Sequence, residues 1–238
     1  MRDASVVRST AHGANLIQLT RLGSVNAFLV REQDGLTLVD TMIPGSAKGV
    51  LAAARVAGAP IVRIALTHAH GDHAGSLDAL VERLPAAEVA FPARDARFLR
   101  GDKTLDPDEP QEKPRGGYVT VDTRPSRELS AGDRVGSLEV IDARGHTPGQ
   151  VAFLDTRDRT LIAADAWSTL GGLAPASRPH PRVLVPGIAT WHRPTAQASA
   201  EALRDLRPAR LAVGHGRVLE QPGPAMDAAL ARAAAATR

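Results

Sequence analysis

A short stretch rich in histidine, residues 67–75, carries side chains that could bind metal ions. It reads Thr-His-Ala-His-Gly-Asp-His-Ala-Gly, which puts three imidazoles and one carboxylate within six positions. Imidazole nitrogens and carboxylate oxygens are common ligands of zinc and similar ions, and the intervening glycine and alanines let the backbone approach a small ion. Because side chains diverge in a tight loop, we expect His68 and His70 to face one ion and Asp72 and His73 to face a neighbouring one.

Three further candidate ligands follow predicted strands later in the chain. They are His146 in Gly-His-Thr-Pro-Gly, Asp165 after the apolar run 161–164, and His215 in Gly-His-Gly. One ion would be bound by His68, His70 and His146, and the other by Asp72, His73 and His215. Asp165 is then available to bridge both ions through its two oxygens. Each ion would have four or five ligands and an open position for water, as catalytic metal sites do.

The predicted chemistry is hydrolysis by a hydroxide held between the two ions. Two divalent ions about 3.5–4 Å apart lower the pKa of a bridging water to near neutrality. Asp72 is the predicted catalytic residue, because its carboxylate could orient the hydroxide and then carry its proton to the leaving group.

Composition limits the class of protein. The chain has 238 residues, of which 43% are hydrophobic and 23% charged, so we expect one globular domain over residues 1–238. No apolar run reaches 18 residues and the first residues do not resemble a signal peptide, so we expect a cytoplasmic protein with no membrane partner. The net charge of only +3 argues against a nucleic-acid partner, and the absence of cysteine excludes thiolate ligands.

The pattern of hydrophobic residues indicates strands that end at these candidate ligands. Residues 15–19, 25–30 and 36–39 predict an antiparallel meander, and the strand 61–66 runs directly into the histidine stretch. Residues 101–127 predict a long loop. Further strands are expected at 88–91, 138–143, 151–154, 160–163 and 210–213, and helices at 46–57, 76–84, 93–99, 195–206 and beyond Pro224. Ser46 is the expected N-cap of its helix. Strands that alternate with helices predict helices packed on a sheet.

The chain resembles the metallo-β-lactamase-fold hydrolases. The Thr-x-His-x-His-x-Asp-His stretch, the three later ligands in the family's order and the final Gly-His-Gly carry this resemblance over nearly the whole length. It implies an α/β fold, a four-layer αββα sandwich with the metal site at one edge. It also implies two divalent ions, usually zinc, with iron or manganese in some members.

Departures from named branches narrow the expected substrate. True β-lactamases lack a bridging aspartate and mostly use a cysteine ligand, whereas this chain has Asp165 and no cysteine. Glyoxalase II enzymes carry a helical domain after the core, but only 23 residues follow His215. Lactonases resemble the chain in layout, although Trp167 and Ser168 lie near the position of their active-site tyrosine.

The sequence therefore predicts a hydrolase of a small ester, lactone or thioester. The alternative is an iron persulfide dioxygenase with a single ion, because such enzymes use the positions that match His68, His146 and Asp165. The predicted partner is a small-molecule substrate, with contacts from Trp167, Ser168, Tyr118 and His192. Core packing is an equally expected role for Trp167. No sequence neighbours suggest ligation by His12, His180 or His192, so an ordinary histidine is expected at the first two and is the alternative to a substrate contact at the third.

Overall fold

The structure is a computed structural model that describes residues 6–178 and 187–235. Contacts between Cα atoms divide the chain into two compact units. The first contains Met1–Asp102 and Gly117–Leu129, and the second contains Lys103–Gly116 and Ser130–Arg238. Each unit is described by itself, and the expected single domain over residues 1–238 stays a prediction.

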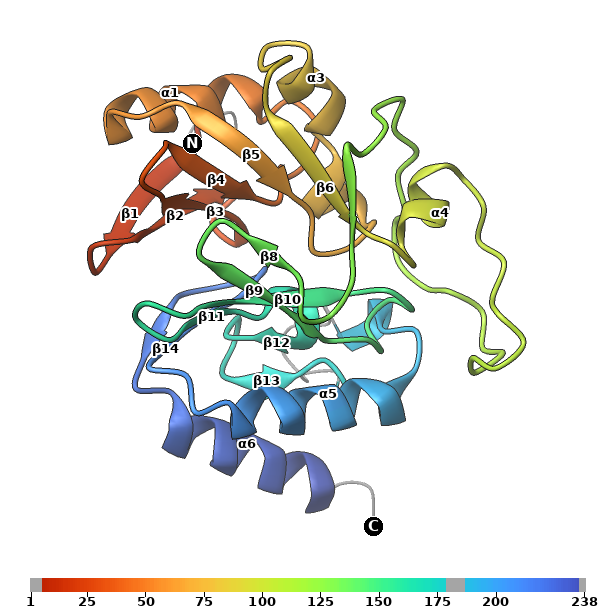
Figure 1. Cartoon of the computed structure of the whole chain (residues 1–238). Coiled ribbons are helices and arrows are strands. Elements are labelled where there is room, and N and C mark those ends of the chain that lie inside the picture. The colour runs from red at the N-terminus through yellow and green to blue at the C-terminus, as the bar shows by residue number, and fades with distance from the viewer. Residues whose placement is uncertain (1–5, 179–186, 236–238) are drawn as a thin grey trace. The chain divides into compact units, whose positions relative to one another are not determined.

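The first unit is built on a seven-stranded sheet whose strands follow one another in chain order (Figure 1). Its strands are β1 (Arg8–His12), β2 (Leu16–Arg21), β3 (Val25–Arg31), β4 (Leu36–Val39), β5 (Ile61–Ala65), β6 (Glu88–Pro92) and β7 (Arg127–Leu129). Neighbours are antiparallel from β1 to β4, which confirms the predicted meander, and parallel from β4 to β7. Parallel strands point the same way, so the residues after β4 and β5 emerge at one edge of the sheet.

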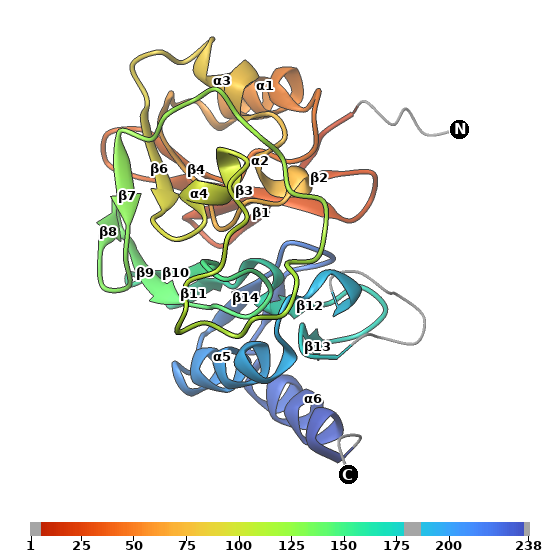
Figure 2. The same ribbon diagram turned by 90° about the vertical axis from the view of Figure 1, so that its right-hand side faces the viewer.

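Four helices belong to the first unit, counted over the residues that the structure describes. They are α1 (Ala47–Ala57), α2 (Gly71–Ala74), α3 (Leu77–Val81) and α4 (Ala96–Leu99). α1 and α3 lie side by side on one side of the sheet (Figures 1 and 2). α1 ends at Gly58, which adopts the left-handed conformation with φ of 78° that favours glycine.

Ser46 is the N-cap residue of α1, as predicted, but its side chain does not cap the helix. Its side chain makes no capping bond; the hydroxyl donates instead to the Ile43 carbonyl and accepts from Arg21. α3 and α4 are also shorter than expected, because the chain turns after Val81 and enters α4 only at Ala96. The strands predicted at 15–19, 25–30, 36–39, 61–66 and 88–91 are present, with ends within two residues of the expected ones, whereas β1 and β7 were not predicted.

The second unit contains a six-stranded sheet and a two-stranded one. The larger sheet has the order β15 (Leu219–Glu220), β14 (Arg210–Ala212), β11 (Thr160–Ile162), β10 (Val151–Asp155), β9 (Leu138–Asp142) and β8 (Arg134–Val135). The pair β11 and β14 is parallel and the other neighbours are antiparallel. The smaller sheet pairs β12 (Trp167–Ser168) with β13 (Ala174–Pro175).

Two long helices, α5 (Arg193–Asp205) and α6 (Gly223–Ala235), pack against each other and against β13 (Figure 2). α5 buries Ala196, Ala200 and Leu203, a spacing of four and three residues that lines one face of a helix. Two short 3-10 helices, η1 (Ala164–Ala166) and η2 (Gly187–Ala189), complete the unit. The hydrophobic core of this unit surrounds Trp167, which has no exposed surface.

The mixed α/β class with more than one sheet is thus confirmed. The predicted long loop is also present: residues 100–126, all within the described part of the chain, form no helix or strand. Tyr118 in this loop makes a single antiparallel bridge with His70. Among residues 6–178 and 187–235, no helix has the length and apolar character needed to cross a membrane.

Candidate metal centre

The histidine stretch lies where the sequence predicts it, directly after β5. His68, His70 and His73 are all buried, and the side chain of Asp72 is 30% exposed. His70 is the N-cap residue of α2, so the short helix that follows carries Asp72 and His73 on its first turn. The structure therefore brings the four side chains of this stretch to one end of the first sheet.

The side chains of this stretch lie close enough in pairs for both members of a pair to contact the same metal ion. The rings of His68 and His73 have centroids 4.1 Å apart, and those of His68 and His70 are 4.9 Å apart at 80°. Ligand atoms of His68 and His70 lie within 4.8 Å of each other, and Nε2 of His73 is 4.0 Å from Oδ2 of Asp72. Three imidazoles packed this closely in a buried place are typical of metal ligands.

Asp40, at the end of β4, orients this cluster, and the sequence analysis missed it. It is 3% exposed and accepts from His73 Nδ1 at 2.7 Å, from the Thr67 amide at 2.8 Å and from the Thr67 hydroxyl at 2.8 Å. A carboxylate can only accept, so Nδ1 of His73 carries the proton and Nε2 keeps its lone pair. This is the arrangement by which carboxylates orient histidine ligands of metals.

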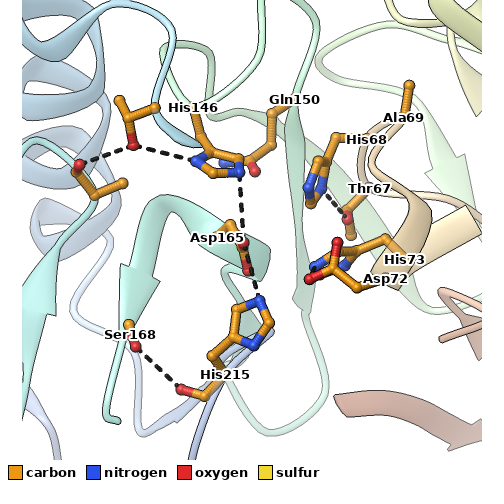
Figure 3. Close-up of polar contacts among 12 residues, drawn as sticks. Thr67, His68, Ala69, Asp72, His73, His146, Gln150, Asp165, Ser168 and His215 are labelled. Atoms are coloured by element: carbon orange, nitrogen blue, oxygen red, sulfur yellow. Dashed lines mark hydrogen bonds and ion pairs between the residues drawn. The ribbon is translucent and has the colours of Figure 1, made fainter. Parts of the chain in front are cut away.

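The same argument fixes the tautomer of His68. The Thr67 hydroxyl gives its only proton to Asp40, so its oxygen accepts the hydrogen bond from Nδ1 of His68 at 3.0 Å (Figure 3). Nε2 of His68 therefore also keeps its lone pair. Two ligand candidates in this unit are thus held in the tautomer that can bind a metal ion.

The second unit holds the other three predicted ligands together. Figure 3 shows the carboxylate of Asp165 between the rings of His146 and His215. Its Oδ2 atom is 3.4 Å from Nε2 of His146 and 3.3 Å from Nε2 of His215. All three residues are at most 3% exposed. His146 follows β9, Asp165 lies in η1 after β11, and His215 follows β14, so each comes from a strand end as predicted.

Two glycines allow the loops of His146 and His215 to lie where they do. Gly145 has φ of 123°, and a Cβ atom there would lie 2.2 Å from the amide nitrogen of Ala196 at the start of α5. Gly216 has φ of 109°, and a Cβ atom there would lie 2.4 Å from the Thr169 hydroxyl. Glycine alone suits positions that combine positive φ with so close an approach.

Two hydrogen bonds between Ala143 and Gln150 close the loop that carries His146. The Ala143 amide donates to the Gln150 carbonyl at 3.1 Å, and the Gln150 side-chain amide donates back to the Ala143 carbonyl at 3.1 Å. Gln150 has no exposed surface and lies beside His146 in Figure 3. The loop is therefore tied at both ends, which restricts the orientation of its histidine.

The predicted substrate contacts of Trp167 and Ser168 stay predictions. Trp167 is fully buried in the core of the second unit, which matches the alternative role expected for it. The Ser168 hydroxyl donates to the His215 carbonyl at 3.3 Å and accepts from the Leu170 amide at 3.2 Å. Its contacts support the His215 loop and do not point to a substrate.

Tyr118 and His192 also have contacts within their own units. The ring of Tyr118 packs against His70 with centroids 4.6 Å apart, and burial raises the pKa of its hydroxyl far above the usual value. His192 caps α5, because its Nδ1 accepts from the Thr195 amide at 3.3 Å. Their roles toward a substrate stay predictions as well. His12 contacts Gln18 at 3.1 Å, and His180 lies outside the described residues.

The donor set fits divalent ions such as zinc, iron or manganese. It consists of imidazole nitrogens and carboxylate oxygens, and the whole sequence has no cysteine that would favour softer metals. The hydrogen bonds to Nδ1 of His68 and His73 leave Nε2 of both rings able to bind a metal ion. Nδ1 of His146 likewise contacts a hydroxyl group, that of Thr190. Both units thus carry histidine and aspartate groups suited to metal binding.

Comparisons with known proteins place these residues in context. A family model described as the metallo-beta-lactamase superfamily matches residues 20–215. The uncharacterized protein YobT of Bacillus subtilis (strain 168) is 44% identical over 88% of this chain and 90% of its own. The probable metallo-hydrolase YflN of the same strain is 26% identical over 79% and 78%. A hydroxyacylglutathione hydrolase of Xanthomonas euvesicatoria pv. vesicatoria (strain 85-10) is 30% identical over 54% and 41%.

Solved structures of similar fold also include metallo-beta-lactamases. DIM-1 metallo-beta-lactamase is 17% identical, with a TM-score of 0.72 over 97% of this chain and 98% of that one. TTHA1623, solved in a di-iron-bound form, is 25% identical, with a TM-score of 0.65 over 90% and 97%. These likenesses confirm the predicted fold class.

Proposed function

The chain belongs to the metallo-beta-lactamase superfamily, and we propose that it is a metal-dependent hydrolase that binds two divalent ions and acts on a small ester, lactone or thioester. The observation that carries this proposal is the carboxylate of Asp165. One of its oxygens lies 3.4 Å and 3.3 Å from the Nε2 atoms of two histidines that the sequence assigns to different ions. A carboxylate in that position is suited to bridge a pair of ions.

We propose that the ligand sets of both units serve one binuclear centre. His68, His70 and His146 would bind the first ion, and Asp72, His73 and His215 the second, with Asp165 shared. Zinc is the proposed metal, with iron or manganese as the alternatives. The di-iron form of the similar protein TTHA1623 supports two ions and keeps iron among the candidates.

The protein's own residues divide the work of hydrolysis. A bound pair of divalent ions supplies a nucleophilic hydroxide near neutral pH and polarises the substrate oxygen. Asp72 is the proposed proton carrier, because its side chain is 30% exposed while the neighbouring histidines are buried. Its Oδ atoms can accept a proton during attack and return it to the leaving group. Asp40 holds His73 in place during these steps.

Two features of the sequence favour an ester, lactone or thioester over an antibiotic substrate. The chain has Asp165 as its proposed bridging ligand and has no cysteine, whereas true β-lactamases of this fold lack a bridging aspartate and mostly use a cysteine ligand. Two of the relatives described above are also named as hydrolases: YflN is a probable metallo-hydrolase, and the Xanthomonas protein is a hydroxyacylglutathione hydrolase. The proposed partner is therefore a small molecule.

Metal analysis of the purified protein, followed by assays with a panel of lactones, thioesters and aryl esters, tests this proposal. We expect about two ions per chain and hydrolysis that is lost with a chelator and restored by metal. One iron per chain, with sulfite released from glutathione persulfide, would establish the alternative dioxygenase instead. A chain that binds no metal would overturn both.

The joint use of both units has its own test. His68→Ala in the first unit and His146→Ala in the second should each remove the same ion, leaving about one ion per chain in either variant and in the double variant. His12→Ala, which removes a histidine that contacts the side chain of Gln18, is the matched control and should keep two ions. Loss of different ions in the two single variants would contradict a shared centre.

A further inference from the structure

Thr190 lies directly beside His146, although 44 residues separate them in sequence. The Thr190 hydroxyl is 3.2 Å from Nδ1 of His146, and Thr190 is 1% exposed. The two residues that follow it donate backbone bonds to the same loop, Trp191 to the His146 carbonyl at 3.0 Å and His192 to the Gly145 carbonyl at 2.9 Å. Residues 190–192 therefore run along the loop that carries the proposed ligand.

The direction of the hydrogen bond between Thr190 and His146 follows from a second bond. The Thr190 hydroxyl donates its proton to the Ala176 carbonyl at 2.9 Å, and a carbonyl can only accept. The hydroxyl oxygen is left as an acceptor toward the imidazole, so Nδ1 of His146 carries the ring proton. The lone pair of the ring is then on Nε2, the nitrogen that lies 3.4 Å from Asp165.

The acceptor at the end of this chain of bonds is itself held next to Asp165. The Ala176 amide donates to the Ala166 carbonyl at 2.9 Å, and Ala166 follows Asp165 in η1. A closed series of contacts thus links His146 through Thr190 and Ala176 to the η1 turn, and from the Asp165 carboxylate in that turn back to His146. A change at the threonine would loosen the position of His146 relative to Asp165.

We propose that Thr190 is a positioning residue that sets the tautomer and orientation of His146 for binding one of the two metal ions. The inference rests on the proposed function, because it needs His146 to be a ligand. It assigns the task to the hydroxyl and not to the methyl group of Thr190. Valine keeps the size and branching of threonine without the hydroxyl, and serine keeps the hydroxyl, so the two variants separate these contributions.

Thr37 provides a matched control for the loss of a buried hydroxyl. It lies in β4 with no exposed surface, and its hydroxyl has no hydrogen-bond partner among the residues that the structure describes. Thr37→Val therefore makes the same change in side chain in a buried place where no ligand is oriented. Thr190→Ala is a second variant without the hydroxyl, for use where Thr190→Val folds poorly.

The experiment measures zinc affinity by competition with a chromophoric chelator and records the visible spectrum of the cobalt-substituted proteins. Urea unfolding of the metal-free proteins shows that the variants compared are folded. We expect Thr190→Val and Thr190→Ala to weaken one of the two ions by about 10- to 100-fold and to alter the cobalt spectrum. Thr190→Ser and Thr37→Val should match the wild-type protein in both measurements.

Three results would overturn the inference. Wild-type affinity and spectrum in folded Thr190→Val would exclude a role of the hydroxyl, while the proposed function would stand if the wild-type protein binds two ions. A loss as large in Thr190→Ser as in Thr190→Val would assign the effect to packing of the methyl group. A wild-type protein that binds no zinc or cobalt would overturn the proposed function and this inference together.

Discussion

The Asp40 carboxylate accepts a hydrogen bond from Nδ1 of His73 at 2.7 Å, and both side chains are buried. The same carboxylate accepts from Thr67, whose hydroxyl in turn contacts His68. One residue at the end of β4 therefore orients two ligand candidates, one directly and one through a hydroxyl. Asp40 also has φ of 63°, a conformation that is unfavourable for a residue other than glycine and that is often found at functional sites.

Replacement of Asp40 should destabilise the fold even without metal. Asp40→Ala leaves the ring N–H of His73 and the amide of Thr67 buried without their acceptor. We expect the free energy of unfolding to fall by about 3 kcal/mol, measured by urea unfolding in the presence of a chelator. Asp108→Ala, at an exposed position, is the control and should leave it unchanged. Equal stability of the two variants would contradict the orienting role of Asp40.

Gly145 should tolerate no side chain. Gly145→Ala combines an unfavourable positive φ with a Cβ atom 2.2 Å from the Ala196 amide nitrogen, so the loop or α5 must move. We expect a loss of roughly 2–5 kcal/mol in the free energy of unfolding, together with weaker zinc binding because His146 is the next residue.

Gly132→Ala separates the two causes of that loss. Gly132 has φ of 91°, but a Cβ atom there would meet nothing within 4 Å. It should cost only about 1–2 kcal/mol, and it should leave zinc affinity unchanged. If both glycine variants lost the same stability, the close approach of α5 to the His146 loop would be unimportant.

Loss of Asp72 should lower turnover strongly and spare the fold. The Asp72 side chain is 30% exposed and lies 4.0 Å from Nε2 of His73, a long contact, so we expect Asp72→Ala to cost the fold little stability. We expect hydrolysis of a responsive ester to fall at least about 100-fold, as for loss of a general acid or base, with the urea midpoint of the metal-free protein unchanged. Wild-type turnover in this variant would remove Asp72 from the proposed mechanism.

The sequence predicted the ligand candidates because their signals are local. The histidine stretch occupies six consecutive positions, and His146 and His215 each follow a strand and stand between turn-forming residues. Long runs of β-branched and apolar residues likewise predicted strands such as β5 and β10. Strands of two or three residues, such as β8 and β15, are too short to show a periodic pattern and were missed.

Residues that orient the ligands could not be predicted in the same way. Asp40 is 33 residues from His73, and Thr190 is 44 residues from His146, so tertiary packing alone brings them together. Asp40 had a weak signal, an acidic residue directly after a buried strand. Thr190 had none, because a threonine before a helix is ordinarily explained by capping. Ser46 is the opposite case. The local pattern predicted a side-chain cap, but its hydroxyl bonds instead to Arg21 and to the Ile43 carbonyl.

Asp78 should make stability depend on pH in the acid range. Burial raises the pKa of its carboxyl group, but hydrogen bonds from the hydroxyl and amide of Thr123 and from the amide of Asp122 outweigh burial, so the pKa is lowered. A carboxyl group with a lowered pKa in the folded state stabilises the fold above its ordinary pKa of about 4, and this contribution disappears as the pH falls through the lower folded value. Asp78→Asn should therefore be less stable than the wild-type protein at pH 6, and the difference should shrink from pH 4 downward.

Urea unfolding at a series of pH values from 6 to 2 measures that difference directly. Thr123→Val keeps the carboxyl group and removes the 2.6 Å bond from the hydroxyl, so it should reduce the same pH-dependent difference without abolishing it. The carboxylate of Asp78 joins α3 to residues 122–123, so the loss at low pH should also expose this segment to a protease earlier than the core strands. A difference between Asp78→Asn and wild type that stayed constant from pH 6 to pH 2 would show that the ionised form of this carboxyl group contributes nothing to holding the segment.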